Sequence, residues 1–145
     1  MQNSGNEFYV ENKLLLEIVT PHGLLFGGYV YEITAAGTEG EFNVLPRHAP
    51  FITILKVGML TYKNDRETGY FFINSGYADV GPEKVTILAD SAERAEDIDV
   101  ERAKAAMKRA EERLKQAEKA DFTRAQSALE RATIRVQVAE KKSAR

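Results

Sequence analysis

Four arginines in the last third of the chain have the type and spacing of an anion-binding set. Arg102 and Arg109 are seven positions apart and Arg131 and Arg135 are four apart, so each pair shares one face if its segment is helical. If the two segments run antiparallel, the early part of the first lies beside the late part of the second, and the four guanidinium groups converge. Convergent arginines suit bidentate binding of phosphate oxygens. The alternative is a set of solubilising charges on exposed helix faces.

Two carboxylates and a histidine form a second group of chemically active residues. Glu39 and Glu41 lie on either side of a glycine in a predicted loop, and His48 follows in the segment 45–50. Such a group can act as an acid–base pair, but the same residues also suit a solvated turn between strands. The chain has no cysteine, and its two histidines, His22 and His48, are far apart on predicted loops, so we expect no metal site.

The elements that position these residues differ between the two parts of the chain. Up to about Ala89 the apolar residues alternate with a period of two, and turn residues interrupt them every eight to twelve positions. All six tyrosines and six of the seven phenylalanines precede Ile98, so we expect the hydrophobic core here. This pattern predicts an all-β sandwich or barrel. The main candidate strands are residues 14–19, 29–33, 51–55, 59–63, 70–73 and 85–88.

The last 47 residues contain no glycine or proline and are rich in strong helix formers. Two heptad seams of equal length, with a break near residues 120–121, predict an antiparallel two-helix hairpin with Asp99 and Asp121 as N-caps. Because every alternate seam position is alanine, the seam buries little area and we expect the hairpin alone to be marginally stable. The seam residues are Val100, Ala103, Met107, Ala110, Leu114 and Ala117, then Phe122, Ala125, Leu129, Ala132, Val136 and Ala139.

Charge divides the chain at the same place. Residues 1–98 hold 7 Lys and Arg against 14 Asp and Glu, whereas residues 99–145 hold 13 against 8. We therefore expect two modules with different partners, the second suited to anionic ones. The predicted organisation is a polar lead-in over residues 1–12, a β-sandwich domain over 13–97 and a helix hairpin over 98–145, in all an α+β protein.

Several classes of function find little support in the residues. The sequence has no phosphate-binding glycine loop, no dinucleotide-binding turn and no nucleophile with a neighbouring base. No stretch approaches the roughly 18 to 20 apolar residues of a membrane span, and the first 12 residues do not resemble a secretory signal. A nucleic-acid binder with a basic helical arm stays an alternative, although 8 acidic residues are scattered through that arm. A stand-alone enzyme is a further alternative, for which no convergent catalytic set is seen.

Four segments, taken in order, resemble the epsilon subunits of bacterial F-type ATP synthases. They are residues 39–50 (EGEFNVLPRHAP), 74–80 (NSGYADV), 85–95 (VTILADSAERA) and 98–103 (IDVERA). The resemblance runs from about Lys13 to Lys141 and covers both modules. Asn43 and Arg47 stand where the family usually has glycine, which bears on the backbone shape of that loop.

The resemblance implies a non-catalytic rotor subunit that couples proton-driven rotation to catalysis. The sandwich would bind the gamma subunit and rest on the ring of membrane c subunits, with Glu39, Glu41 and His48 near that ring. The helices, when extended, would enter the alpha/beta catalytic hexamer and inhibit ATP hydrolysis. The subunit would be peripheral at the cytoplasmic face of a bacterial cell membrane, attached only through the complex, and would bind no nucleic acid.

The resemblance also implies that ATP is a regulatory ligand of the folded hairpin and that no cofactor is required. In Bacillus-type members ATP binds through a glutamate, the aspartate and arginine of an I/L-D-x-x-R-A motif, and three further arginines. All six positions carry the required residue type here, and four of them are the arginines singled out by helix geometry. They are Glu93, Asp99, Arg102, Arg109, Arg131 and Arg135.

Overall fold

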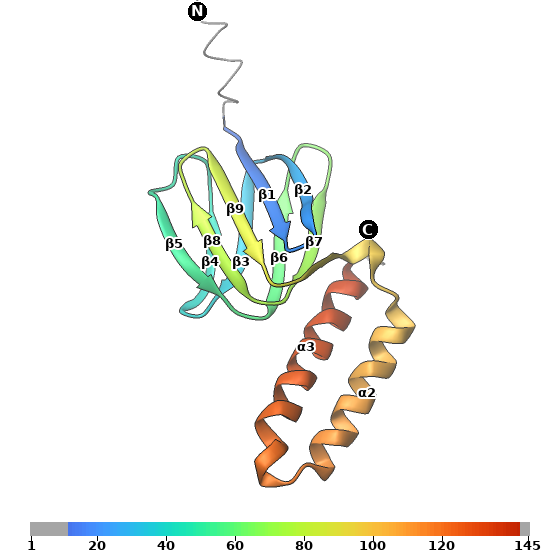
Figure 1. The fold of residues 1–145 in the computed structure, drawn as a ribbon. Coiled ribbons are helices and arrows are strands. Elements are labelled where there is room, and N and C mark those ends of the chain that lie inside the picture. Colours follow the sequence, from blue (N-terminus) through green and yellow to red (C-terminus); the bar gives the residue numbers. More distant parts are fainter. Residues whose placement is uncertain (1–11, 143–145) are drawn as a thin grey trace, which may run out of the picture.

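The computed structural model describes residues 12–142, in which a β-sandwich is followed by two long helices that lie side by side below it (Figure 1). The strands are β1 (Leu14–Thr20), β2 (Gly23–Val30), β3 (Glu32–Gly37), β4 (Gly40–Val44), β5 (Phe51–Leu55), β6 (Gly58–Lys63), β7 (Thr68–Ile73), β8 (Gly76–Val80), β9 (Lys84–Ala89) and β10 (Ala92–Arg94). The helical elements are the 3₁₀ turn η1 (Ala95–Asp97), α2 (Val100–Gln116), the 3₁₀ turn η2 (Lys119–Asp121) and α3 (Phe122–Lys141). The predicted sandwich followed by an antiparallel hairpin is confirmed.

The strands form one continuous sheet that folds over on itself. Their order is β10-β7-β6-β3-β5-β8-β9-β1-β2. β4 lies outside this order and pairs with β3. The pairing is antiparallel throughout except between β1 and β9, which run parallel. The register between β1 and β2 shifts at Ile18 and Val19, where a bulge lets the pair bend.

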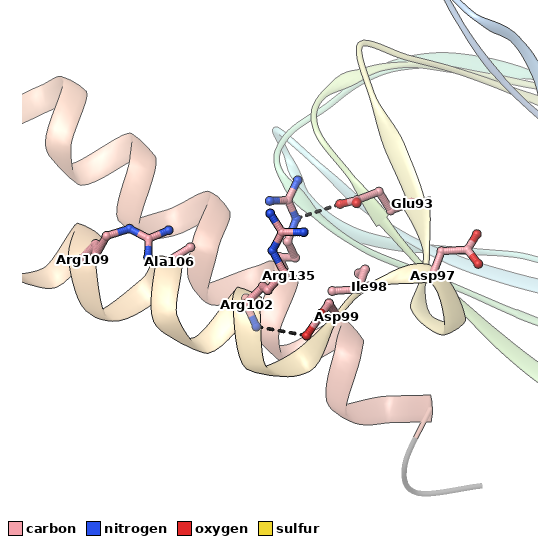
Figure 2. A pocket seen from close by; sticks show the side chains of 9 residues that line it. Glu93, Asp97, Ile98, Asp99, Arg102, Ala106, Arg109 and Arg135 are labelled. Carbon is pink, nitrogen blue, oxygen red and sulfur yellow. Dashed lines mark hydrogen bonds and ion pairs between the residues drawn. The ribbon is translucent and has the colours of Figure 1, made fainter.

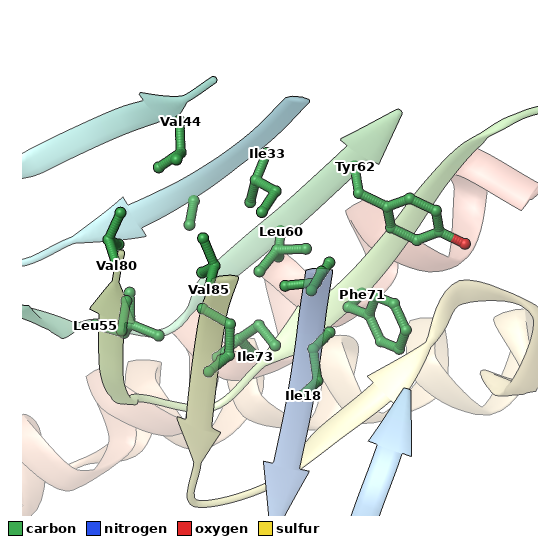
Figure 3. Packing of buried hydrophobic residues seen from close by; sticks show 14 of the residues in the cluster. Ile18, Ile33, Val44, Leu55, Leu60, Tyr62, Phe71, Ile73, Val80 and Val85 are labelled. Atoms are coloured by element: carbon green, nitrogen blue, oxygen red, sulfur yellow. The ribbon is translucent and has the colours of Figure 1, made fainter. Parts of the chain in front are cut away.

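The core lies inside the folded sheet because alternate residues of each strand point inward. On β1, Leu14, Leu16 and Ile18 are fully buried, and Val85 and Ile87 of the neighbouring β9 pack beside them (Figure 3). Burying such a side chain contributes roughly 1.5–3 kcal/mol. The period-two pattern of the sequence thus marks the face that each strand turns to the core.

The side chain of Arg94 on β10 helps to join the two ends of the sheet. Its Nη2 atom donates a hydrogen bond to the carbonyl of Leu25 on β2, at 3.0 Å. The guanidinium carbon also lies over the rings of Phe26 and Phe71, at 5.4 and 5.5 Å from their centroids. Each such cation–π contact is worth roughly 0.5–2 kcal/mol. Arg94 therefore fixes the strand that leads into the helices against the first hairpin of the sandwich.

Two expectations about the strands and loops of the sandwich are wrong. The single strand predicted over residues 29–33 is divided, because β2 ends at Val30 and β3 begins at Glu32. The loop predicted around Glu41 is a tight hairpin in which Glu41 lies on β4, opposite Ala36. Gly40 makes this hairpin possible, since its φ of 126° is one that other residues rarely adopt.

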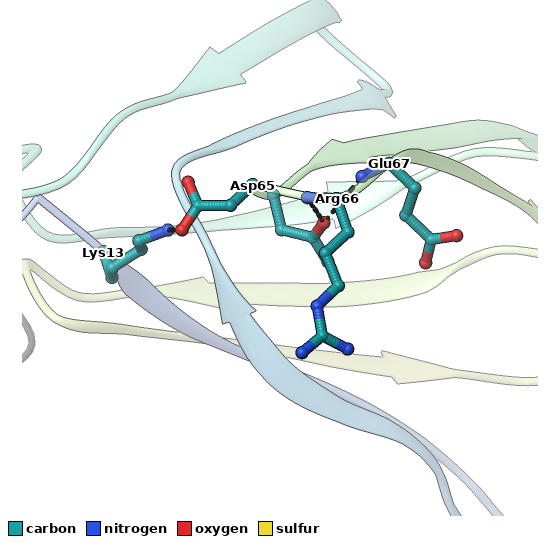
Figure 4. A network of polar contacts seen from close by, with 5 residues as sticks. Lys13, Asp65, Arg66 and Glu67 are labelled. Carbon is teal, nitrogen blue, oxygen red and sulfur yellow. Dashed lines mark hydrogen bonds and ion pairs between the residues drawn. The ribbon is translucent and has the colours of Figure 1, made fainter.

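Polar contacts close the end of the sandwich that is farther from the helices (Figure 4). In the turn between β6 and β7, the Asn64 side-chain carbonyl accepts hydrogen bonds from the backbone N–H groups of Arg66 and Glu67, at 2.8 and 2.9 Å. Lys13, just before β1, pairs with Asp65 of the same turn at 2.7 Å. These contacts tie the first strand to the β6–β7 turn.

The helix caps differ from each other. Asp99 caps α2 as expected, and its carboxylate accepts a hydrogen bond from the Arg102 N–H at 3.1 Å. Asp121 precedes α3 but makes no capping hydrogen bond, because it belongs to η2 and has φ −104° and ψ 2°. The expectation for Asp121 as a side-chain cap is therefore wrong. Phe122, expected in the seam, is 45% exposed at the tip of the hairpin.

The hairpin packs on the sandwich through α3, which lies against β6 and β7. A second cluster of buried residues forms there, in which Phe72 of β7 meets Ala95, Ile98, Ala103, Val136, Val138 and Ala139. Val138 falls outside the predicted seam because α3 buries a second face, against the sandwich. At the end of α3, Lys142 donates hydrogen bonds to the carbonyls of Ile98 and Glu96. Within residues 12–142, no helix combines the length and the apolar character needed to cross a bilayer.

Candidate functional site

A groove between α2 and α3, at the end next to the sandwich, gathers most of the predicted site residues (Figure 2). Its first chamber has a volume of about 330 Å³, near the lower end of the roughly 300–1,000 Å³ usual for ligand sites. Three arginines and three carboxylates line this chamber. They are Arg102, Arg109 and Arg135 with Glu93, Asp97 and Asp99.

Glu93 and Arg135 meet at the boundary between the two modules. Glu93 lies on β10 directly opposite Phe72 of β7, so both side chains face the helices. Arg135 of α3 reaches them from the other side, with its Nε 2.7 Å from the Glu93 Oε1. Its guanidinium carbon is 5.0 Å from the centroid of the Phe72 ring. Arg135 thus forms an ion pair and a cation–π contact with the sandwich at once.

The ion pair is close but not fully satisfied. The Nε and Oε1 atoms are both buried, yet neither makes a hydrogen bond with good geometry to any group within residues 12–142. Buried polar atoms normally find such partners, and a shortfall costs about 1–3 kcal/mol per group. The pair is therefore held by charge attraction at 2.7 Å and not by a well-aligned hydrogen bond.

Asp99 has two tasks at the start of α2. One carboxylate oxygen caps the helix by accepting the Arg102 N–H, while the side chain also lines the first chamber (Figure 2). The IDVERA segment therefore places a carboxylate and a guanidinium on the first turn of one helix. These two groups can recognise a ligand that offers both hydroxyl donors and anionic oxygens.

A second chamber of about 320 Å³ continues the groove toward the hairpin tip and shares Ala106, Arg109 and Arg135 with the first. Arg113 of α2 and Arg131 of α3 add two guanidinium groups, and no acidic side chain is among the residues that line this chamber. The two chambers therefore differ in charge. The first mixes carboxylates and arginines, whereas the second presents arginines only.

The structure brings all six predicted ATP-site residues to this one groove. Five of them line the first chamber and Arg131 lines the second. Of the arginines described, only Arg135 has a carboxylate within ion-pair distance in the groove. Arg109, Arg113 and Arg131 have no carboxylate within ion-pair distance in the second chamber, and cations so gathered favour an anionic ligand.

Sequence reasoning missed three residues of the second chamber. Arg113 could have been found, since it is four positions after Arg109 and shares its helix face. Phe72 and Asn74 come from β7 and the residue after its end, on the sandwich. Their contribution depends on how the hairpin docks, which periodicity does not reveal.

The second predicted group does not form one site. Glu39 and Glu41 lie at the β3–β4 turn, close to the end of β5 at Leu55. His48 lies beyond the opposite end of β4, where its ring centroid is 5.3 Å from that of Phe51 at the start of β5. The length of a strand separates the histidine from the carboxylates, so the structure shows no acid–base constellation of these three residues.

The outer face of the sandwich carries a continuous line of apolar side chains, which we call the apolar row. Its members are direct partners across β5, β8, β9, β1 and β2. Ile54 and Tyr77 are 54% and 55% exposed, and Leu88 and Leu24 are 47% and 61% exposed. The row consists of Ile54, Tyr77, Leu88, Val19 and Leu24. Contiguous exposed apolar surface of this kind typically marks a protein interface.

Comparison with known proteins finds two family models that match successive parts of the chain. A family model described as ATP synthase, Delta/Epsilon chain, beta-sandwich domain matches residues 13–95, and one described as the long alpha-helix domain of the same chain matches residues 96–140. An ATP synthase epsilon chain of Thermodesulfovibrio yellowstonii is 51% identical over 107 residues, which are 74% of this chain and 76% of the relative. An ATP synthase epsilon chain of Geotalea uraniireducens is 54% identical over 104 residues, 72% of this chain and 75% of the relative.

Solved structures share the fold. A chain from the cryo-EM structure of the Euglena gracilis mitochondrial ATP synthase (OSCP/F1/c-ring) aligns with a TM-score of 0.75 and 21% identity, covering 94% of this chain and 84% of that chain. A chain from the central stalk and c-ring of the Tetrahymena thermophila mitochondrial enzyme aligns with a TM-score of 0.53 and 15% identity, covering 90% of this chain and 96% of that chain. At these identities the likeness concerns the fold alone.

Proposed function

The chain belongs to the epsilon-chain family of ATP synthases, and from this premise we propose that it is a non-catalytic subunit of the central rotor stalk of a proton-translocating enzyme. The observation that carries the proposal is the match of both modules, in order, over residues 13–140. The subunit would be peripheral at the cytoplasmic face of the bacterial membrane, held there by its complex. It would couple the rotation of the stalk to catalysis in neighbouring subunits.

The apolar row is the surface we propose for docking on the gamma subunit. It offers four large side chains that are each about half exposed, across five adjacent strands. Aromatic residues often dominate the binding energy of such a surface, and Tyr77, between Ile54 and Leu88, is the aromatic member of the row. Burial of the row against gamma would remove apolar area from water at roughly 25 cal/mol per Å².

The β3–β4 turn is the segment we propose for contact with the ring of c subunits. Glu39 and Glu41 are both exposed there, and the tight geometry of the hairpin holds their backbone. His48 lies at the other end of the sandwich wall, beside Phe51. The proposal therefore assigns the two carboxylates to the ring and gives His48 a separate surface.

ATP is the ligand we propose for the groove, with its triphosphate in the second chamber. Four guanidinium groups line that chamber and no acidic side chain is among its lining residues, although Arg135 is paired with Glu93 of the first chamber. Such a set suits the oxygens of a phosphate chain. The ribose and base would lie in the first chamber, where Glu93, Asp97 and Asp99 can accept hydrogen bonds from hydroxyl and amino groups. The difference in charge between the chambers supports this orientation.

The hairpin is proposed to be a two-state element that ATP holds in the folded position. Its seam is rich in alanine, and one small cluster around Phe72 docks it on the sandwich. A ligand at one hundred times its dissociation constant adds about 2.7 kcal/mol to the state that binds it. This shifts a two-state equilibrium about a hundredfold. Released helices would extend into the alpha/beta hexamer and block ATP hydrolysis.

The proposal is tested with the isolated subunit and with the assembled complex. Arg109→Ala removes a guanidinium shared by both chambers, and Lys108→Ala removes the same charge from an exposed neighbour outside them. Calorimetry should show ATP binding by the wild-type chain and by Lys108→Ala, and at least about tenfold weaker binding by Arg109→Ala. The complex with Arg109→Ala should hydrolyse less ATP. No heat and no protection of hairpin amides at millimolar ATP would refute the ligand.

A further inference from the structure

The second chamber has a wall made by the sandwich, not by the helices. Phe72 and Asn74 are two positions apart around the end of β7, so their side chains leave the sheet on the same face. Phe71 and Ile73 between and beside them point into the sandwich core. Phe72 and Asn74 are therefore turned toward the hairpin, where α2 and α3 present four arginines.

The backbone of Asn74 is fixed by a hydrogen bond, whereas its side-chain amide makes none within residues 12–142. The Asn74 N–H donates to the Ser91 carbonyl at 2.9 Å, which links the end of β7 to the segment before β10. The side chain is half-buried and makes no hydrogen bond to any residue of the described range 12–142. It faces a chamber lined by Arg109, Arg113 and Arg131. An amide differs from those groups because it can both donate and accept.

We propose that Asn74 is a further ligand-binding residue, which donates its side-chain N–H to a phosphoryl oxygen of the bound nucleotide. This inference rests on the proposed binding of a nucleotide in the groove. In this arrangement the arginines bind the phosphates from the two helices, and Asn74 binds them from the sandwich. The ligand then bridges the two modules, so that it fixes the position of the hairpin on the sandwich as well as the closure of the hairpin itself.

The amide at this place also sets a condition on charge. A carboxylate of the same shape would lie among Arg109, Arg113, Arg131 and Arg135 and would supply the negative charge that the ligand otherwise brings. Asn74→Asp should therefore oppose the nucleotide but favour the docked hairpin when no ligand is present. A neutral Asn74 leaves docking dependent on the ligand.

The test compares two substitutions at Asn74 with one control in the full chain. Asn74→Ala removes the donor, Asn74→Asp replaces it by a carboxylate, and Gln126→Glu adds one negative charge to the outer face of α3, away from the groove. Calorimetry with ATP should show about tenfold weaker binding for Asn74→Ala and still weaker binding for Asn74→Asp. Gln126→Glu should bind as the wild type does. Thermal unfolding of each variant checks that the sandwich is intact.

Hydrogen exchange gives the second measurement. Without ATP, Asn74→Asp should slow amide exchange in α3 where it meets β7, whereas Gln126→Glu should not. If the wild type binds ATP and Asn74→Ala binds it equally well, Asn74 does not contact the nucleotide, but the nucleotide site itself is supported. A wild-type chain that takes up no ATP would overturn the nucleotide site and this contact together.

Discussion

The Oε1 atom of Glu93 lies 2.7 Å from the Nε atom of Arg135, although one belongs to the last strand of the sandwich and the other to the last helix. The Phe72 ring, opposite Glu93 on the neighbouring strand, lies 5.0 Å from the same guanidinium. The two modules are therefore joined by a charged contact at the rim of the groove. A ligand that engages Arg135 must act on this junction.

Replacing Arg135 should loosen the hairpin from the sandwich. Arg135→Met removes the ion pair and leaves the Glu93 carboxylate beside an apolar cluster, so amides of α3 should exchange faster and ATP should bind at least about tenfold more weakly. Arg135→Lys keeps the charge but loses the planar group that covers Phe72, so its effect should be intermediate. Arg124→Met, near the hairpin tip, serves as the control. Unchanged exchange in Arg135→Met would argue against the junction.

Tyr62 should make stability depend on pH in the alkaline range. Burial and a hydrogen bond to Glu67 raise the pKa of its phenol to about 12. Because the pKa of the phenol in the folded state exceeds its unfolded value of 10.0, protonated Tyr62 contributes to the free energy of unfolding. This contribution is fully present below pH 10 and is lost as the pH rises through 12. Measured by urea unfolding, the free energy of unfolding of the wild type should fall by up to about 2 kcal/mol between pH 9 and pH 11.5. Tyr62→Phe should not show this fall. Parallel pH profiles of the two proteins would contradict this.

A sandwich without the hairpin should fold if it keeps β10. A chain that ends at Ile98 retains the β10–β7 pairing and the contacts of Arg94 with Leu25, Phe26 and Phe71, and should unfold cooperatively. A chain that ends at Asp90 loses them and should be less stable by at least about 2 kcal/mol. Denaturant unfolding measures both. Equal stability of the two chains would show that Arg94 does not close the sheet.

The apolar row should control binding to gamma without affecting the fold. Tyr77→Ser should weaken binding of isolated gamma at least about tenfold, because it removes the aromatic member of the row. Leu45→Ser removes a leucine that is 51% exposed outside the row and should bind as the wild type does. Melting temperatures should stay within a few degrees in both. Equal losses of affinity would place the interface elsewhere.

The two ends of the sandwich should differ in coupling. Glu41→Lys reverses an exposed charge at the β3–β4 turn and should lower proton-driven ATP synthesis in membranes, with the melting temperature nearly unchanged. Glu83→Lys reverses an exposed charge at the opposite end, where Arg47 and Pro82 lie. It should leave synthesis unaltered. If Glu83→Lys lowered ATP synthesis and Glu41→Lys did not, the end of the sandwich that carries His48 would be the one that contacts the ring.

Most of the sandwich could be predicted because burial on one face imposes a period of two. β2 and β4 were not predicted because glycines interrupt their alternation of apolar and polar residues. Gly27 and Gly28 lie within β2, and Gly40 begins β4. The hairpin was predictable from its heptads. Val138 was not, because it faces a strand distant in the sequence.

The candidate site could be anticipated as far as helix geometry reaches. Arg102 and Arg109 share a face of one helix, and Arg131 and Arg135 share a face of the other, so antiparallel packing alone brings them together. That argument says nothing about Phe72 or Asn74, which enter the groove only because α3 docks on β7. It also cannot show that Glu93 forms an ion pair with Arg135.

The contact of Arg94 with Leu25 also bears on how the edges of the sheet are exposed to other chains. β10 and β2 are the two ends of the strand order, and a strand at the end of a sheet has unpaired backbone groups that recruit strands of other chains. Here the guanidinium holds these edges against each other and occupies a carbonyl of β2. We therefore expect the contact to make pairing between copies through β2 and β10 less favourable, while β4, which pairs only with β3, keeps a free edge.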